Sequence, residues 1–388
     1  MNTKLSQLFK DFTSSEKNAG LVLVFCTIMS LFLANSNFQH SYLHFWHQET
    51  SFSLPFVNLN LSIEHWINDG LMTIFFLLVG LEIERELYDG ELHPIKNALL
   101  PILCALGGMI IPAIIYNFFN FNTETSSGFG IPMGTDIAFA LGIISLAGNK
   151  VPNSIKILLT AIAIIDDLGS IIVIAVFYGS GINYTSLLLS LGCFSILLIL
   201  NRLKIHKLIP YLILGIIMWF FMMQSGIHPT ISGVLLAFAI PFGKGDEKSI
   251  SIKLQSFLHL PVAFIILPLF TLANTAIPIK TEFIANLSGQ HSLGILFGLF
   301  IGKPIGIVSA FYLAIKTKIT SLPNQTNWQH IVGLGTIAGI GFTMSIFITQ
   351  LAFNKDEIIQ SAKLMILITS TLAAVAGLLI FKLNKTTA

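Results

Sequence analysis

Apolar runs of roughly 18 to 25 residues recur along almost the whole of this chain, and they restrict its fold more than any other feature. Each run is long enough to cross about 30 Å of hydrocarbon as a helix, whereas an open sheet edge would find no hydrogen-bond partner in lipid. The chain has 388 residues, of which 54% are hydrophobic and only 10% charged, a balance that excludes a soluble domain of this size. We therefore predict an all-α polytopic membrane protein in which residues 1–388 form one integral membrane domain.

The hydropathy pattern predicts about twelve transmembrane helices. Their approximate bounds are 18–36, 62–87, 97–118, 130–147, 154–178, 184–200, 207–223, 226–242, 258–277, 291–315, 328–352 and 358–381. Of the lysines and arginines between these spans or near their ends, 17 fall on one side and only two, Lys280 and Lys355, on the other. By the positive-inside rule, this asymmetry places both termini in the cytoplasm.

Residues 37–61 form the longest predicted loop on the outside. Their stretch SFSLPFVNLNLS alternates apolar and polar residues around Pro55, which favours a short exposed hairpin, although a proline also fits an irregular loop. An exposed strand edge of this kind could pair two subunits.

Four ionisable residues lie deep inside predicted spans, and they are Asp136, Asp166, Asp167 and Lys303. A charge at the centre of a membrane helix costs roughly 2.5 to 3.5 kcal/mol on insertion scales, so such a residue marks a functional site by default. Neighbouring residues of a helix project about 100° apart, so Asp166 and Asp167 suit two tasks better than one. One could pair with Lys303 while the other faces a cavity. A purely structural Asp–Lys pair would leave two carboxylates unexplained.

The chemistry of these groups fits ion exchange. Buried carboxylates and lysines can load and release protons near neutral pH. The same carboxylate oxygens, once deprotonated, are ligands that a hard cation such as Na⁺ accepts. A proton and a cation would therefore compete for one site.

Two predicted spans contain sequences that break helices. GFGIPMGTDIAFALG places three glycines and a proline before Asp136, and GLGTIAGIGFTMSIFI contains four glycines. The two stretches lie in the middle spans of residues 97–178 (spans 3–5) and 291–381 (spans 10–12). Paired interruptions in two halves of a chain are typical of transporters built from inverted repeats, with the site where the broken helices meet.

Seven motifs resemble those of the NhaA family of Na⁺/H⁺ antiporters, in the same order over nearly the full length. They are WINDGLMTIFFLLVGLE, GTDIAFALG, LTAIAIIDDLGSIIVIAVFY, SGIHPTISGV, LPLFTLAN, IGKPIGI and GIGFTMSIFI. The resemblance implies two interrupted helices that cross near mid-membrane, and a homodimer in the bacterial inner membrane joined partly through the outside hairpin. It also implies a secondary active transporter, not an enzyme: electrogenic exchange of cytoplasmic Na⁺ or Li⁺ for H⁺ by alternating access, for pH and sodium homeostasis. No cofactor and no nucleic-acid partner are expected.

The resemblance also assigns roles to the intramembrane residues. Asp167 matches the carboxylate that binds the ion and carries the proton, and Asp166 matches its partner, which pairs with the lysine at Lys303. Thr135 and Asp136 match the pair on the interrupted helix that helps bind the cation and balances the helix ends. Transported Na⁺ would thus contact Asp167, Asp166 and Thr135.

A second set of residues matches family positions linked to pH response or cation access, although solvated helix ends would look the same. The set consists of Glu82, Arg85, Glu86, His228 and Asp69. The chain departs from the family pattern at three positions nearby. Glu84 stands where a basic residue is frequent, and Gln255 and Ser256 stand where an acid and a histidine can form part of a pH sensor. The resemblance therefore leaves the pH profile open.

Other functions compete with antiport. A carrier that moves an organic anion with Na⁺ would need a basic or polar pocket, and only Lys303 offers a cation deep in a span besides the more peripheral Lys363. An intramembrane aspartyl protease also needs two membrane carboxylates that share a proton, but the sequence has MGTD and IIDD in place of the GxGD and YD motifs of that class. A passive channel would suit glycine-rich spans, yet it has no need of a lysine–carboxylate pair.

Overall fold

The computed structural model describes residues 16–54, 57–90, 95–179, 181–243, 249–320, 322 and 326–384. The chain divides into two compact units. Unit 1 comprises residues 1–26, 94–170 and 279–388, and unit 2 comprises residues 27–93 and 171–278. The boundaries fall inside α2 (Glu16–Ala34) and α8 (Asn153–Phe177), so each of these helices contributes to both units.

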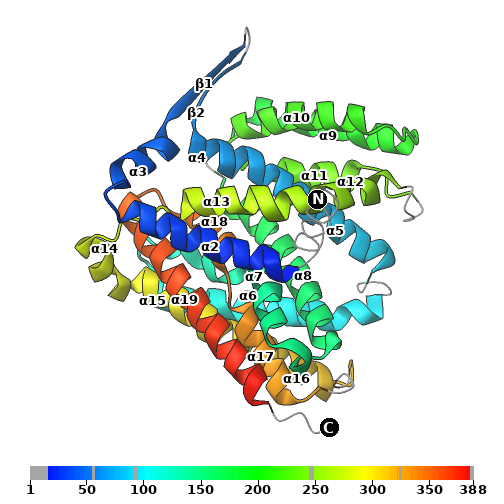
Figure 1. Ribbon diagram of the computed structural model, residues 1–388. Helices are drawn as coiled ribbons and strands as arrows, with labels where there is room; N and C mark the ends of the chain where they lie inside the picture. The colour runs from blue at the N-terminus through cyan, green and yellow to red at the C-terminus, as the bar shows by residue number, and fades with distance from the viewer. Residues whose placement is uncertain are drawn as a thin grey trace, which may run out of the picture. The chain divides into compact units, whose positions relative to one another are not determined.

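Unit 1 holds both of the stretches that were expected to interrupt helices. Besides its parts of α2 and α8, it consists of α6 (Ile95–Asn120), η2 (Ser126–Met133), α7 (Ile137–Leu146), η3 (Gly148–Lys150), α14 (Thr281–Ala285), η5 (Asn286–Ser288), α15 (Gln290–Phe297), η6 (Gly298–Gly302), α16 (Lys303–Lys316), α17 (Trp328–Ala338), α18 (Phe342–Ala352) and α19 (Asp356–Leu383). In Figure 1 α16, α17 and α19 run side by side, and α17 packs against both of the others.

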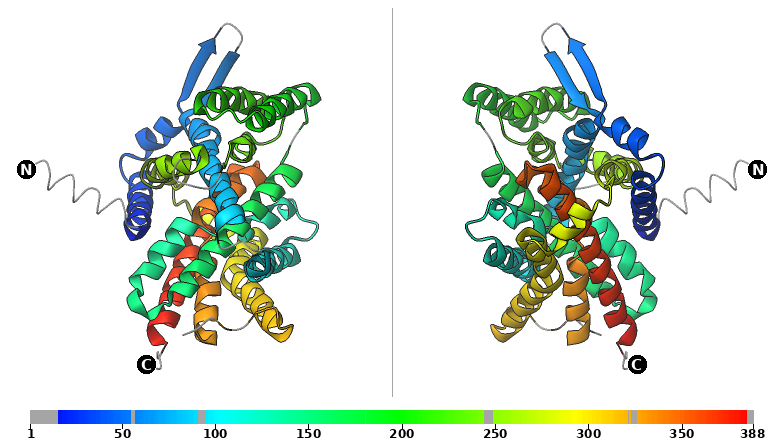
Figure 2. Two further views of the ribbon diagram at one scale, coloured as in Figure 1. Left: turned by 90° about the vertical axis from the view of Figure 1, so that its right-hand side faces the viewer. Right: turned by 90° about the vertical axis from the view of Figure 1, so that its left-hand side faces the viewer.

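Unit 2 carries the chain's hairpin. Its elements are α3 (Gln39–His47), β1 (Glu49–Leu54), β2 (Val57–Ser62), α4 (Ile63–His65), η1 (Trp66–Leu71), α5 (Met72–Asp89), α9 (Tyr184–Arg202), α10 (Leu208–Gln224), α11 (Ile231–Ala239), α12 (Ile250–Pro261), η4 (Val262–Ile266) and α13 (Leu267–Asn274), together with parts of α2 and α8. The strands pair antiparallel, with Glu49 opposite Ser62 and Leu54 opposite Val57. The hairpin projects away from the helices of its own unit (Figures 1 and 2).

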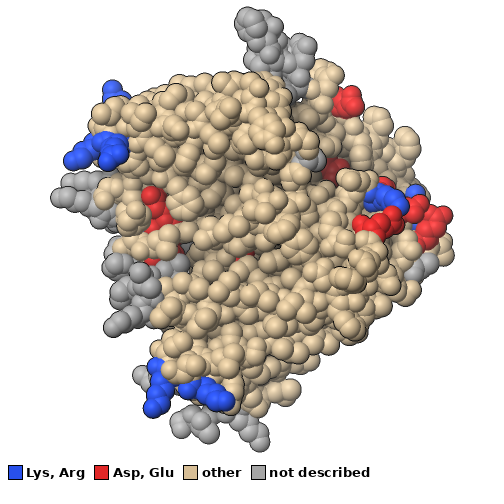
Figure 3. Space-filling view, turned by 180° about the vertical axis from the view of Figure 1, so that it is seen from behind, with Lys and Arg blue, Asp and Glu red and all other residues tan. Residues whose placement is uncertain are grey.

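The prediction of an all-α polytopic membrane fold is confirmed. Within the described residues, seven helices are long and apolar enough to cross a membrane, and three bent helix pairs raise this number to as many as ten. The spans expected at 207–223 and 226–242 correspond to the shorter helices α10 and α11. On the face drawn in Figure 3, broad areas carry neither acidic nor basic side chains, as a lipid-facing surface requires.

The predicted start of the ninth span is wrong. The helix begins at Ile250 and not near residue 258, and it continues through the π-helical turn η4 to Asn274. Ser251 and Gln255, which precede the expected start, are buried on the first turns of α12. Polar side chains can lie inside a membrane protein where a partner helix covers them, and here α12 packs against α5.

Close backbone contacts position the functional residues in each unit. In unit 1, a Cβ atom on Gly107 of α6 would lie only 2.4 Å from the carbonyl oxygen of Gly306, one turn after the start of α16. In unit 2, a Cβ atom on Gly233 of α11 would lie 2.2 Å from the carbonyl oxygen of Thr73 on α5. Small residues allow such approach in membrane proteins, where packing and not the hydrophobic effect holds helices together.

Candidate ion-binding site

The two broken spans of unit 1 meet at their breaks. The chain bends by 43° between η2 and α7, and by 42° between α17 and α18. The backbone N–H of Asp136, in the first break, donates to the carbonyl oxygen of Ile340, in the second, at 2.7 Å. A hydrogen bond of 2.9 Å also joins the Thr135 hydroxyl to the carbonyl oxygen of Ala338, the last residue of α17. The prediction of two interrupted helices that cross is confirmed.

Asp136 caps two helices at once. Its Oδ1 accepts from the backbone N–H of Phe139 in the first turn of α7, at 2.9 Å. Its Oδ2 accepts from the backbone N–H and from the hydroxyl of Thr343, in the first turn of α18, at 3.1 and 2.6 Å. Helix N-termini carry unpaired N–H groups and a partial positive charge, so one buried carboxylate stabilises both.

Lys303 is fully buried at the start of α16. Its Nζ donates to Oδ2 of Asp166, and to the Thr135 hydroxyl at 2.9 Å. The π-helical turn η6 directly precedes the lysine. Such turns insert an extra residue into a helix and are frequent at functional sites, because they redirect the side chains that follow. The structure thus brings together two residues that are 137 positions apart in the chain.

Thr135 links the charged pair to the broken helices. Its hydroxyl lies 2.8 Å from Oδ2 of Asp166 and 2.9 Å from the carbonyl oxygen of Ala338. A hydroxyl has one hydrogen, so it donates to one of these acceptors at a time. The other carboxylate oxygen of Asp166, Oδ1, is buried and has no hydrogen-bond partner among the described residues.

Asp167 is also buried, with only 1% of its surface exposed. It follows Asp166 on α8, and its side chain leaves the helix about 100° away. The five residues expected at the ion site therefore lie in unit 1. Lys303, Asp166 and Thr135 contact one another, and Asp136 and Asp167 are their neighbours in the chain.

Two residues of this centre were not singled out in the sequence. Thr343 gives both of its polar groups to Asp136, and the hydroxyl of Ser370 on α19 accepts from the backbone N–H of Phe342, the first residue of α18, at 3.2 Å. The signal for Thr343 was its place two residues after the glycine pair of GIGFT. Nothing in the sequence marks Ser370, whose role depends on the packing of α19.

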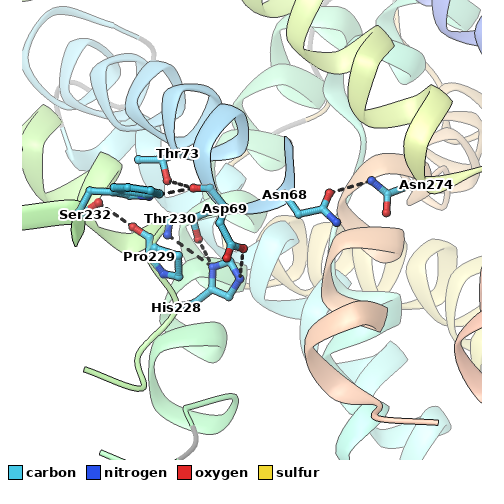
Figure 4. Close-up of polar contacts among 9 residues, drawn as sticks. Asn68, Asp69, Thr73, His228, Pro229, Thr230, Ser232 and Asn274 are labelled. Atoms are coloured by element: carbon cyan, nitrogen blue, oxygen red, sulfur yellow. Dashed lines mark hydrogen bonds and ion pairs between the residues drawn. The ribbon is translucent and has the colours of Figure 1, made fainter. Parts of the chain in front are cut away.

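Asp69 and His228 form a separate cluster in unit 2 (Figure 4). His228 Nε2 lies 3.5 Å from Oδ1 of Asp69, and its Nδ1 is 2.7 Å from the Thr230 hydroxyl. The backbone carbonyl of Asp69, within the π-helical turn η1, accepts from Trp219 Nε1 at 3.0 Å and from the Thr73 hydroxyl at 2.5 Å. The cluster thus fixes the π-helical turn and the start of α11 to each other within unit 2.

The other residues of the second set lie towards the far end of α5, about 20 to 26 Å along the helix from Asp69 in η1. Arg85 is exposed and pairs with Glu86 at 2.9 Å, and Glu82 is half-buried. Glu84 is only 6% exposed, and its Oε2 accepts from the Ser251 hydroxyl at 3.1 Å. The structure therefore does not gather the second set into one site.

Comparison with known proteins identifies the family. A family model described as Na⁺/H⁺ antiporter 1 matches residues 10–381. The chain belongs to this family. A relative called Na(+)/H(+) antiporter NhaA from Flavobacterium psychrophilum is 58% identical over 96% of this chain and 95% of its own length. An NhaA antiporter from Cytophaga hutchinsonii is 54% identical over 98% of this chain and 96% of its own length.

The fold also has a solved relative. The sodium proton antiporter MjNhaP1 from Methanocaldococcus jannaschii matches with a TM-score of 0.53 over 94% of this chain and 92% of its own, at 17% sequence identity. The resemblance to NhaA antiporters found in the sequence is thus confirmed, and the protein is a multi-pass membrane protein of the Na⁺/H⁺ antiporter 1 family.

Proposed function

We propose that this protein is an electrogenic antiporter that exports cytoplasmic Na⁺ or Li⁺ in exchange for protons by alternating access. The observation that carries the proposal is the buried centre of unit 1, where Lys303, Asp166 and Thr135 contact one another at the junction of two broken helices. Buried ionisable groups are expensive in a membrane, so a centre of this kind marks an ion pathway. The names of its relatives fit the same activity.

The transported Na⁺ contacts Asp167, Asp166 and Thr135 in this proposal. Hard cations prefer oxygen ligands, and every one of these side chains offers oxygen. Oδ1 of Asp166 is buried without a hydrogen-bond partner among the described residues, so it can accept a cation without losing a bond. Asp136 helps to bind the cation, and its two oxygens also cap α7 and α18 and so balance the ends of the broken helices.

Protons reach the same site from the other side of the membrane. One proton neutralises Asp167, and a second enters the Asp166–Lys303 pair; arrival of Na⁺ releases both. Two positive charges then move inward for each one that moves outward, so the cycle carries net charge and responds to the membrane potential.

Alternating access follows from the broken helices of residues 97–178 and 291–381, which we regard as inverted repeats. A short break lets each half-helix move while Asp136 and Thr135 keep the helix ends balanced around the site. Modest movement of one group of helices is then enough to expose the site to one side or the other.

The setting of the protein is part of the proposal. It lies in the bacterial inner membrane with both termini in the cytoplasm, and two copies pair partly through β1 and β2, whose outer edges offer backbone groups to a partner. Asp69 and His228 contribute to the pH dependence of transport. At the cytoplasmic end of α5, a second group contributes to this pH dependence or to cation entry: Glu82, Arg85 and Glu86. The transport serves pH and sodium homeostasis.

The proposal is tested in everted membrane vesicles from a bacterium that lacks its own Na⁺/H⁺ antiporters. A respiration-driven pH gradient is established, Na⁺ or Li⁺ is added, and loss of the gradient is followed by dye fluorescence from about pH 6.5 to 9. We expect a cation-dependent loss with the intact protein and none with Asp167→Asn.

The matched control is Asp356→Asn, which makes the same change at an exposed residue of α19 and should leave transport unchanged. A protein that is present in the membrane but gives no cation response at any pH would contradict antiport and favour an organic-anion carrier.

A further inference from the structure

Ser170 is a fully buried residue of α8 whose hydroxyl has no hydrogen-bond partner among the described residues. Buried hydroxyls are normally bonded, and an exception asks for an explanation. Serines and threonines inside helices usually donate to the carbonyl four residues earlier, as Thr160 does to Lys156 on this same helix at 3.1 Å. Ser170 makes no such bond to Asp166.

The position of Ser170 on α8 relates it to both aspartates. With about 100° per residue, Ser170 projects about 40° from Asp166 and about 60° from Asp167, so its direction lies between theirs. It stands one turn further along the helix, and side chains three and four residues apart are neighbours. Ser170 is therefore the next residue on the face of the helix that carries the two carboxylates.

The hydroxyl of Ser170 also faces the first broken span. A Cβ atom placed on Gly134 would lie 3.7 Å from the Ser170 oxygen, so this oxygen is close to the backbone of Gly134. Gly134 directly precedes Thr135, whose hydroxyl contacts Asp166. The oxygen of Ser170 thus lies beside the segment that supplies Thr135, and its residue is one helical turn from the carboxylates of α8.

We propose that the Ser170 hydroxyl is a neutral ligand for the transported cation and helps the protein choose between Na⁺ and Li⁺. This inference rests on the proposed antiport. Hard cations bind oxygens at about 2.3 to 2.6 Å, so two oxygens up to about 5 Å apart can bind the same ion. Side chains one helical turn apart can place their oxygens at such a distance. The unbonded oxygens of Ser170 and Asp166 then bind the same ion.

Location separates Ser170 from the other buried hydroxyls without a partner. The side chains of Ser154, Tyr211 and Thr271 also contain such oxygens, but none of these residues is within one helical turn of an intramembrane carboxylate. An unbonded hydroxyl by itself carries no ligand role. The neighbouring carboxylates and Thr135 make Ser170 a ligand.

The test replaces Ser170 with alanine, which removes the oxygen and leaves the packing almost unchanged. Ser154→Ala is the matched control, because it removes an unbonded hydroxyl from the same helix about 24 Å away. We measure Na⁺ binding to the purified protein by calorimetry, the concentrations of Na⁺ and Li⁺ that give half-maximal exchange in vesicles, and the thermal unfolding midpoint.

If Ser170 is a ligand, Ser170→Ala should weaken Na⁺ binding and raise the half-maximal Na⁺ concentration by about tenfold, as expected for losing one bond to a charged group. The change for Li⁺ should be smaller, because a smaller ion needs fewer ligands. Ser170→Cys should resemble Ser170→Ala, since sulfur is a poor ligand for hard cations. Ser154→Ala should change neither ion.

A purely structural Ser170 gives a different result. Removing an unbonded buried hydroxyl would then raise the unfolding midpoint and leave the half-maximal Na⁺ and Li⁺ concentrations as they are in the intact protein. That result, obtained with an intact protein that transports Na⁺, would show that Ser170 is not a ligand. Loss of the proposed antiport itself would be seen separately, as absence of any Na⁺ response in the intact protein.

Discussion

The two broken spans of unit 1 bend by almost the same angle, 43° and 42°, but they are built from different groups. The break between η2 and α7 contributes side chains, from Thr135 and Asp136. The break between α17 and α18, at residues 339–341, contributes backbone: carbonyl oxygens accept from Thr135 and Asp136. One break thus provides the charge for both, and the other provides backbone acceptors at Ala338 and Ile340, with glycines on both sides of Ile340.

This division explains why one aspartate is enough. Asp136 bonds to the N-termini of α7 and α18, so a single negative charge balances two partial positive charges. A second acid in the other break would place two carboxylates side by side and raise the cost of burial. We expect the two breaks to respond differently to substitution.

The largest effect should come from Asp136→Ala. It removes the acceptor for Phe139 on α7 and for both donors of Thr343 on α18, so buried N–H groups in both broken spans lose their partners. Bonds to a buried charge contribute about 1.5 to 3 kcal/mol each, and we expect a loss of at least about 3 kcal/mol in the free energy of unfolding. Thermal unfolding in detergent measures it.

Asp136→Asn sharpens the result. The amide oxygen can still accept a hydrogen bond for one helix, so an intermediate unfolding midpoint is expected. Equal midpoints for Asp136→Ala and the intact protein would show that the breaks do not depend on a shared charge.

A smaller effect is expected in the other break. A Cβ atom on Gly339 would lie 2.5 Å from the backbone carbonyl oxygen of Leu299, which cannot rotate away. Gly339→Ala should therefore lower the free energy of unfolding by about 1 to 3 kcal/mol through overpacking.

Gly192→Ala is the control for this substitution. Gly192 lies on α9 with no atom within 4 Å of an added Cβ, so alanine there should stabilise the helix by about 0.5 to 1 kcal/mol. Similar results at both positions would mean that the close packing at residues 339–341 has no energetic importance.

The smallest effect concerns how each broken span begins. α17 starts with a capping box, in which the Asn327 side chain accepts from the His330 N–H and His330 Nδ1 accepts from the Asn327 N–H, whereas η2 starts without a side-chain cap. Asn327→Ala should cost about 1 kcal/mol, and Asn327→Ser should restore most of it, because a serine hydroxyl can also accept at this position of a capping box. Equal unfolding midpoints for the two variants would show that the cap does not contribute to the difference between the two broken spans.

The sequence predicted the all-α membrane fold and both breaks, because the bilayer restricts the backbone so strongly. A run of apolar residues must form a helix in lipid, and the glycines and proline before Asp136 and around Gly339 cannot continue one without cost. The start of the ninth span could not be predicted in this way. Ser251 is polar, and only the packing of α12 against α5 shows that it meets the buried Glu84.

The pairings inside the site were harder to predict than its members. Buried acids and a lysine are conspicuous in an apolar sequence, so Asp136 and Lys303 stand out. The contacts of Thr343 and Ser170 are not visible there, because hydroxyl residues are common in membrane helices and their partners come from other elements. Their significance depends on which helix ends and carboxylates the fold places beside them.

Proton release on cation binding tests most directly whether Na⁺ and H⁺ share the centre of unit 1. Na⁺ is added to purified protein in a weakly buffered solution, and the pH is recorded with the intact protein, Asp167→Asn and Asp356→Asn. Competition for one site predicts an acid shift of about two protons per bound Na⁺ at most, with the intact protein and Asp356→Asn but not with Asp167→Asn. Na⁺ binding without any proton release would contradict exchange at a shared site.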